Sequence, residues 1–197
     1  MDPLAIAVLV LWVVVVALGV VVFALARQIG VLFERVAPMG ALVTDGGPKV
    51  GEASPRFELQ TLAGAMLPVG AGGGRSTLIF FLSPTCPMCK KLLPVLKSAS
   101  KAERGWLDVI LASDGERDRQ QAFVRQHDLA AFPYVLSSEL GMSYRVNRLP
   151  FAVLLDGEGI VRAKGLVNSR EQLESLFHAK ELGVESIQRY LDVQPAE

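Results

Sequence analysis

The hydrophobic positions of this chain divide it into two unlike parts. Residues 4–26 form one apolar run without a charged side chain. A helix of ~20 apolar residues is long enough to cross a bilayer, whereas strands average only ~5–6 residues. Beyond residue 56, apolar positions occur in short runs that alternate with polar segments. The pattern therefore predicts one transmembrane anchor over residues 1–26, followed by a globular domain.

A cleaved signal peptide is the alternative for this run, because residues 24–26 (Ala-Leu-Ala) have the small-x-small form of a cleavage site. However, no Lys or Arg precedes the run, and it exceeds the ~7–15 residues of a signal h-region. Arg27 and Arg35 follow it, so a positive-inside count would place the domain in the cytoplasm. Glu34 offsets one of these charges, and long domains cross membranes largely regardless of charge. The residues alone leave the side open.

Composition predicts how the remainder is divided. Residues 27–42 form a juxtamembrane segment that is expected to be helical until Ala37-Pro38 stops the helix. Residues 43–56 are rich in Gly and Pro, as linkers are. We place the juxtamembrane segment and linker at residues 27–50, one globular domain at 51–182 and a C-terminal helical tail at 183–197.

Strand-length apolar runs alternate with helical patterns in the globular part. Strands are expected at residues 57–60, 66–69, 77–82, 106–112, 134–136, 151–156 and 160–165. Helices are expected at 87–103, 115–126, 139–144 and 184–192, and the helix at 115–126 should direct Ala122 and Phe123 inward. A further helix is expected to begin at a cap formed by Asn168 or Ser169, with Glu171 or Gln172 at the capping-box position. This order predicts an α/β fold: a largely parallel sheet, closed by an antiparallel hairpin and preceded by an N-terminal β-hairpin extension.

Charge and cysteine content exclude several classes of protein. The 20 basic and 20 acidic residues balance, and no basic block is present that would bind nucleic acid. The Gly-rich stretch at residues 70–76 lacks the GK[ST] of a phosphate loop. The chain has only two cysteines, both in one motif, so it has no separate disulfide framework.

Those cysteines, Cys86 and Cys89, stand where a predicted strand feeds a predicted helix. The free N–H groups and dipole of that helix would stabilise a thiolate on Cys86. Pro87 suits the first helical position, and Lys90 and Lys91 add positive charge that tunes the thiol. Cys89 follows one turn later, within reach of a disulfide. We expect Cys86 to be the nucleophile and Cys89 the more buried resolving thiol, and the Cys86–Cys89 disulfide to be the only redox group.

A second feature precedes the predicted strand at 151–156, namely Leu149-Pro150. In a thiol–disulfide enzyme a cis proline here lies beside the attacking sulfur, and the residue before it offers backbone hydrogen bonds to a substrate. A cis X–Pro bond costs only ~0.5–1 kcal/mol, so it can be retained. We expect Pro150 to line the substrate groove and four residues to contact the substrate: Leu149, Thr85, Pro87 and Met88.

Metal binding is the alternative use of the thiols. Zinc usually requires four ligands, and His127 and His178 are isolated, so no zinc site is expected. Cys86, Met88 and Cys89 are soft ligands that suit Cu(I), and a Cu(I)-binding chaperone stays open as an alternative. Two inert core cysteines are disfavoured, because a Pro-Met insert at a helix start is a poor place for them.

The motif and its surroundings resemble the thioredoxin superfamily, through "FFLSPTCPMCK", Leu149-Pro150 and the hairpin "LLDGEGIVRAKG". The segment "VGEASPRFELQTLAGAMLPVG" is similar to the extra hairpin of membrane-anchored thioredoxin-like proteins and of peroxiredoxins. More narrowly, the whole chain resembles the MauD family of methylamine dehydrogenase accessory proteins. "LARQIGVLFERVAPMGAL", "GPKVGEASP", "WLDVILASDG" and "VRAKGLVNSREQLESLF" carry that likeness together with the cysteine motif.

The resemblance implies a thioredoxin-like fold with one transmembrane helix, in the inner membrane, with the domain facing the periplasm. On that ground we prefer the periplasm to the side that the positive-inside count favours. It also implies a role in maturing the methylamine dehydrogenase small subunit, which carries many disulfides and a tryptophan-derived quinone. The implied partners are this subunit, other methylamine-utilisation maturation proteins and a membrane or periplasmic redox partner.

Two positions depart from the thioredoxin pattern. Thr85 stands where thioredoxins have Trp, and Phe80 stands where they have a buried Asp. No carboxylate is therefore poised to move the proton of Cys89, so we expect oxidation or isomerisation rather than general reduction. A peroxiredoxin-like peroxidase is a further alternative: Ser83 fits that motif, but Ile79 stands where the motif has Pro. The third is a membrane scaffold in which the thiols are incidental.

Overall fold

The computed structural model describes residues 3–4, 11–20, 22–23 and 46–182. The chain divides into two compact units, Met1–Gly40 and Ala41–Glu197, which are considered separately. In the first unit, residues 11–20 are helical, and apolar side chains such as those of Leu11 and Trp12 are exposed. No helix within the described residues is both long and apolar enough to span a membrane. The rest of the predicted anchor, the juxtamembrane segment at 27–42 with its predicted helix and the tail helix at 184–192 lie outside the described residues.

The second unit is built on a five-stranded sheet in the order β5-β4-β3-β6-β7. The central strand β3 (Ser76–Phe81) pairs in parallel with β4 (Leu107–Ser113) and antiparallel with β6 (Phe151–Leu155). Outside these lie β5 (Tyr134–Leu136), parallel to β4, and β7 (Val161–Leu166), antiparallel to β6. The predicted α/β fold, with parallel strands and a closing antiparallel hairpin, is confirmed.

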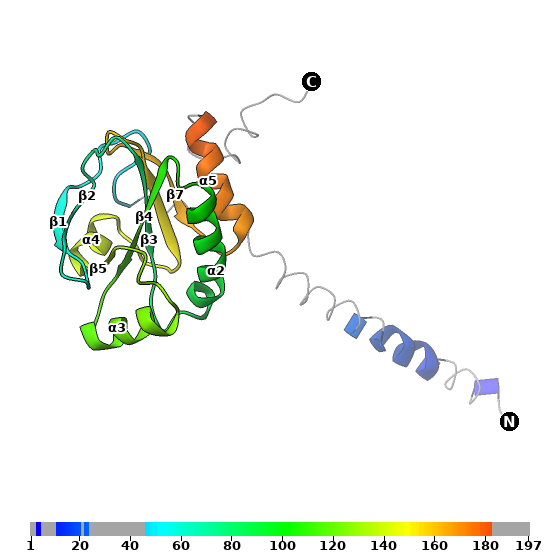
Figure 1. The fold of residues 1–197 in the computed structure, drawn as a ribbon. Helices are drawn as coiled ribbons and strands as arrows, with labels where there is room; N and C mark the ends of the chain where they lie inside the picture. Colours follow the sequence, from blue (N-terminus) through cyan, green and yellow to red (C-terminus); the bar gives the residue numbers. More distant parts are fainter. Residues whose placement is uncertain (1–2, 5–10, 21, 24–45, 183–197) are drawn as a thin grey trace, which may run out of the picture. The chain divides into compact units, whose positions relative to one another are not determined.

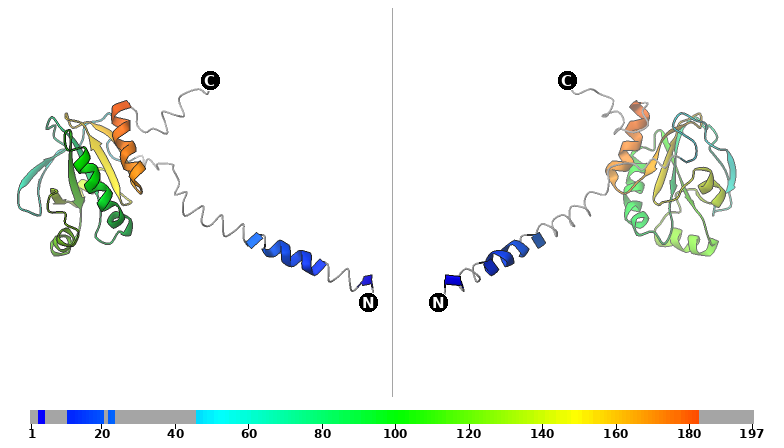
Figure 2. Two further views of the ribbon diagram at one scale, coloured as in Figure 1. Left: turned by 45° about the vertical axis from the view of Figure 1, so that its right-hand side comes forward. Right: turned by 180° about the vertical axis from the view of Figure 1, so that it is seen from behind.

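Helices and a hairpin cover the two faces of this sheet (Figures 1 and 2). The other elements are β1 (Phe57–Gln60), β2 (Met66–Val69), α2 (Pro87–Ala102), α3 (Arg117–Gln126), α4 (Ser138–Ser143) and α5 (Arg170–Leu182). Successive residues of a strand point to opposite faces. Leu78 and Phe80 therefore enter the core cluster beneath α2 and α5, whereas Ile79 and Phe81 enter the cluster beneath α4 and the β1–β2 hairpin.

The segment before β1 packs on the domain, so residues 51–56, which the Gly- and Pro-rich composition alone predicts as part of a linker, belong to the domain that we place at 51–182. The Gly51 N–H donates to the Val161 carbonyl at 2.8 Å and the Ser54 N–H to the Gly159 carbonyl at 2.9 Å. The Ser54 hydroxyl, which is buried, is hydrogen-bonded to the Tyr144 hydroxyl. The Gly content serves tight turns here, since Gly51 has a φ of +90°, a conformation that favours glycine.

The inward face of α3 also differs from the prediction. Phe123 is buried as expected, but Ala122 is exposed and Gln120 is buried instead. Residues three apart share a helix face, whereas neighbours diverge by about 100°. Gln120 is accommodated in the core because its Oε1 accepts a hydrogen bond from the Tyr134 hydroxyl at 2.6 Å. At α5 the expected cap is present, since Ser169 Oγ accepts from the Gln172 N–H at 3.3 Å.

Candidate active site

The two cysteines lie at the junction between β3 and α2. Cys86 is the N-cap of α2, with extended backbone angles (φ −80°, ψ 112°), and Pro87 follows at the first helical position. An N-cap side chain faces the free N–H groups of the first helical turn. Accordingly, the Cys89 N–H donates to Cys86 Sγ at 3.2 Å. This hydrogen bond, together with the helix dipole, favours a negative charge on the sulfur.

The two thiols, both free, differ sharply in their surroundings. Cys86 is half-buried, whereas Cys89 is fully buried in the core cluster that includes Phe80. Burial, followed by the hydrogen bond with the Cys86 side chain, raises the pKa of the Cys89 thiol to about 12. A disulfide of another molecule can therefore reach Cys86, while Cys89 stays protonated and shielded until the attack on Cys86 has occurred.

The segment before β6 lies against Cys86. The β3–β6 register pairs Phe81 with Phe151, so the residues that follow β3 and precede β6 meet at one end of the sheet. The Leu149–Pro150 peptide bond is cis. The Cys86 thiol donates to the Leu149 carbonyl oxygen at a sulfur–oxygen distance of 3.9 Å. Pro150 is buried and Leu149 is partly exposed, so a chain bound at Cys86 would meet the Leu149 backbone.

The remaining predicted site residues surround Cys86 in different ways. Thr85 and Pro87, its neighbours in sequence, are exposed, and the Thr85 hydroxyl is hydrogen-bonded to that of Ser83 at 2.9 Å. Met88 is half-buried and packs against the core cluster. Lys90 is exposed, and its backbone N–H donates to the Cys86 carbonyl oxygen at 3.3 Å. Thr85, Pro87 and Leu149 thus offer the open surface beside the sulfur.

Sequence reasoning missed one residue of the site, Tyr134. It is buried on β5 in the same cluster as Cys89, and its hydroxyl donates to Gln120 Oε1 at 2.6 Å. Burial raises the pKa of Tyr134 to about 12, and negative charge on Cys89 adds to this rise. A tyrosine at a buried strand position requires a hydroxyl partner, but only the fold shows that the partner comes from α3.

No group of three or more His, Cys, Asp or Glu side chains gathers as a metal site among the residues that the structure describes. His127 instead packs against the ring of Phe123, with ring centroids 4.6 Å apart. Its backbone carbonyl accepts a hydrogen bond from Lys97 Nζ at 2.7 Å.

Comparison with known proteins places this site in a family. The sequence profile of a thioredoxin-like family matches residues 73–161. The methylamine utilization protein MauD of Paracoccus denitrificans is 46% identical over 187 residues, which cover 93% of this chain and 92% of that protein. MauD of Methylorubrum extorquens is 45% identical over 183 residues, which cover 92% of this chain and 88% of that protein. The chain belongs to the MauD family.

Solved structures share the fold of this MauD-family chain. A protein described as a DsbE-type thiol:disulfide interchange protein from Chlorobium tepidum superposes with a TM-score of 0.62 at 18% identity, over 68% of this chain and 99% of that one. StoA of Bacillus subtilis superposes with a TM-score of 0.54 at 26% identity, over 64% and 99% of the two chains. The fold is therefore thioredoxin-like, as predicted.

Proposed function

We propose that this MauD-family chain is a thiol–disulfide oxidoreductase that acts in methylamine utilisation. The observation that carries the proposal is the hydrogen bond from the Cys89 N–H to Cys86 Sγ at the start of α2. It stabilises a thiolate on the accessible sulfur, and the thiolate is the form that attacks a disulfide. The name shared by the relatives, methylamine utilization protein MauD, supports the process in which the chain acts.

The reaction requires only the two sulfurs. The Cys86 thiolate attacks one sulfur of a substrate disulfide, a mixed disulfide forms and the second substrate sulfur leaves as a thiolate. Cys89 then loses its proton and attacks Cys86 Sγ, which closes the Cys86–Cys89 disulfide and releases the substrate as a dithiol. The same steps in reverse oxidise a substrate dithiol. No cofactor besides this disulfide is needed.

The surroundings of Cys89 favour isomerisation over general reduction. Its pKa of about 12 keeps Cys89 protonated near neutral pH, and Phe80 supplies no carboxylate to remove that proton. A mixed disulfide at Cys86 therefore persists long enough for other thiols of the substrate to attack it and exchange partners.

We infer that the client is the small subunit of methylamine dehydrogenase, and that other methylamine-utilisation maturation proteins and a membrane or periplasmic redox partner act with this chain. We further propose that residues 4–26, which are apolar and uncharged, anchor the protein in the inner membrane as a single span. The domain then faces the periplasm, where disulfides persist.

Trapping the mixed disulfide tests this function. The Cys89→Ser variant, made in cells that produce methylamine dehydrogenase, retains Cys86 but lacks the resolving thiol. Acid quenching followed by mass spectrometry is expected to find the dehydrogenase small subunit linked to Cys86. The Cys86→Ser variant is the matched control and is expected to form no adduct.

The identity of the trapped adduct, and the labelling of Cys86, show which part of the proposal is wrong if the expected adduct is not found. If only another redox protein is captured, the chain relays electrons and the proposed client is wrong. If nothing is captured, although a membrane-impermeant maleimide labels Cys86 in intact spheroplasts, the thiol-exchange function is wrong. If that maleimide labels Cys86 only after lysis, the proposed periplasmic location is wrong.

A further inference from the structure

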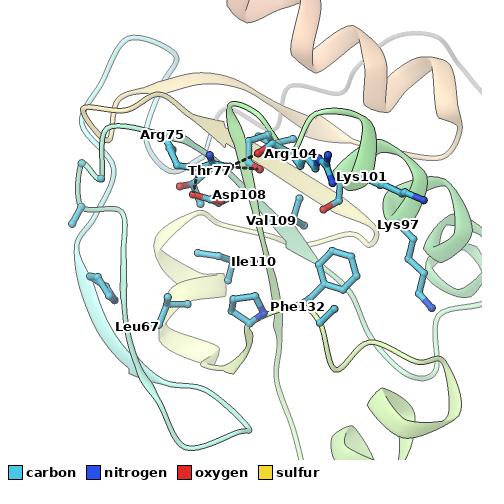
Figure 3. Close-up of a pocket in the computed structure, with 18 of the residues that line it drawn as sticks. Leu67, Arg75, Thr77, Lys97, Lys101, Arg104, Asp108, Val109, Ile110 and Phe132 are labelled. Carbon is cyan, nitrogen blue, oxygen red and sulfur yellow. Dashed lines mark hydrogen bonds and ion pairs between the residues drawn. The ribbon is translucent and has the colours of Figure 1, made fainter.

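A groove of about 770 Å³, drawn in Figure 3, lies over the start of β4. It runs over the first half of β4, between the last turns of α2 and strand β2. Lys101, one of its lining residues, follows Cys86 by 15 positions along α2. At 1.5 Å per helical residue, the two backbones are separated by roughly 22 Å. The groove is therefore distinct from the site at Cys86.

The floor of the groove is an unpaired stretch of sheet edge. β5 is short and pairs only with the residues Leu111–Ser113 of β4. The Leu111 N–H donates to the Pro133 carbonyl, which shows that odd-numbered residues of β4 direct their backbone groups toward the β5 side. The Leu107 carbonyl accepts from Arg75 at 3.3 Å. Val109, two residues further on, has no partner for its N–H and C=O on this side within the described residues.

The wall along α2 is basic. Of its cations, Lys97 forms an ion pair with Asp128 at 3.5 Å. Lys101 and Arg104 are exposed and form no ion pair within the part of the chain that the structure describes. Figure 3 shows these three side chains along one side of the groove and Leu67 on the other, with Phe132 between them. The groove thus combines free positive charge, an apolar surface and a free strand edge.

We propose that this groove binds an extended acidic segment of a partner protein, which adds as a further strand to the open edge of β4. Strand addition uses main-chain hydrogen bonds for affinity and side-chain pockets for specificity. In this groove the Val109 N–H and C=O provide the main-chain partners. Lys101 and Arg104, on the face that α2 covers, bind carboxylates of the segment, while its alternate apolar residues point to the opposite face and contact Leu67.

The net charge of the groove favours an acidic partner segment over a basic or neutral one. Arg75 and Lys97 are offset by Asp108 and Asp128, so Lys101 and Arg104 leave the surface with net positive charge. A basic segment would meet repulsion there, and a neutral one would leave both cations without a counter-charge. Extended peptides with alternating apolar and acidic residues fit both the pleat of the strand and this charge.

The probe is a fluorescent ten-residue peptide of alternating Val and Glu, added to the full-length reduced protein in detergent micelles. Fluorescence anisotropy is expected to show saturable binding, and the same peptide with Lys in place of Glu is expected not to bind. The double variant that carries both Lys101→Glu and Arg104→Glu should bind the acidic peptide at least tenfold more weakly. A control double variant with the same change in net charge, Arg56→Glu with Arg119→Glu, should change the affinity for the peptide less than twofold.

Amide hydrogen exchange, measured by NMR, tests the strand addition itself. On adding the acidic peptide, exchange at the Val109 amide is expected to slow at least tenfold, while reaction of Cys86 with a small aromatic disulfide stays unchanged. Equal weakening by both charge-reversal pairs, or unchanged exchange at Val109, overturns the proposal. Protection of Val109 without peptide also overturns it. In that case a second copy fills the groove if protection rises with protein concentration, and a segment of the same chain fills it otherwise.

Discussion

Phe80 and Cys89 lie in the same core cluster, and neither side chain is accessible to solvent. In the thioredoxins that this chain resembles, a carboxylate occupies the position of Phe80. Here the resolving thiol must lose its proton in an apolar environment, and burial has raised its pKa to about 12. The second half of the reaction cycle, in which Cys89 attacks the mixed disulfide, should therefore be slow and sensitive to this one position.

Replacing Phe80 by Asp should accelerate that second step. A positioned general base typically contributes about 10²–10⁴-fold to a proton transfer, and we expect at least a tenfold gain at pH 7. A small aromatic disulfide permits the measurement, because attack by Cys86 releases one coloured thiolate and attack by Cys89 releases the second.

Phe80→Asn is the control for this substitution, since it has the size of Asp without a basic group. Both variants should lose about 3–5 kcal/mol of stability, as large aromatic residues do when truncated in a core, so folding is checked by circular dichroism. If Asn accelerates the second step as much as Asp, looser packing and not proton transfer is the cause.

The rate of the second step should rise with pH. The fraction of Cys89 present as thiolate grows tenfold per pH unit while the pH stays below its pKa of about 12. Forming the mixed disulfide removes the interactions with the Cys86 side chain that contribute to the raised pKa of Cys89, but burial, the largest cause of the shift, remains. A plot of log rate against pH is therefore expected to have a slope of about +1 from pH 6 to 9. A plateau within that range would show that Cys89 ionises far more easily than its burial indicates.

The sequence was sufficient to predict the elements that carry the chemistry. Continuous apolar runs, Leu78–Phe81 within β3 and the whole of β6, identified these strands, because strands buried on both faces have few polar positions. A Pro after a Cys at a strand–helix junction located the N-cap of α2. These predictions held because each rests on a local constraint of backbone or burial.

Other features depended on contacts that local patterns do not encode. The segment before β1 was predicted as a linker from its Gly and Pro residues, but Ser54 finds Tyr144, a partner 90 positions away in sequence. Gln120 is not part of the inward face that the sequence predicts from Ala122 and Phe123, yet it is buried in the core, where it accepts a hydrogen bond from the Tyr134 hydroxyl. In both cases a long-range hydrogen bond offsets the cost of burying a polar group.

The Ser54–Tyr144 hydrogen bond should contribute measurably to stability. Tyr144→Phe removes one partner of a buried pair and is expected to lower the free energy of unfolding by about 1–2 kcal/mol. Ser54→Ala, alone and combined with Tyr144→Phe, completes a double-mutant cycle in chemical denaturation. A coupling energy near zero would mean that the segment before β1 does not stabilise the domain through this contact.

Two glycines with left-handed backbone angles should differ in their tolerance of alanine. Gly64, in the turn between β1 and β2, has a φ of +95°, and an added Cβ would meet nothing within 4 Å. Gly64→Ala should therefore cost only the backbone strain, about 1–2 kcal/mol. Gly70, at the end of β2, has a φ of +79°, and its Cβ would overlap the Pro55 carbonyl oxygen.

Because that carbonyl belongs to the backbone, it cannot move aside as a flexible side chain would. Gly70→Ala should carry the same strain together with the cost of overpacking, about 2–5 kcal/mol in total. Denaturation midpoints of the two variants, measured side by side, give the comparison. Equal losses would show that the segment containing Pro55 yields to the added methyl group, and that its packing against β2 is looser than the contacts indicate.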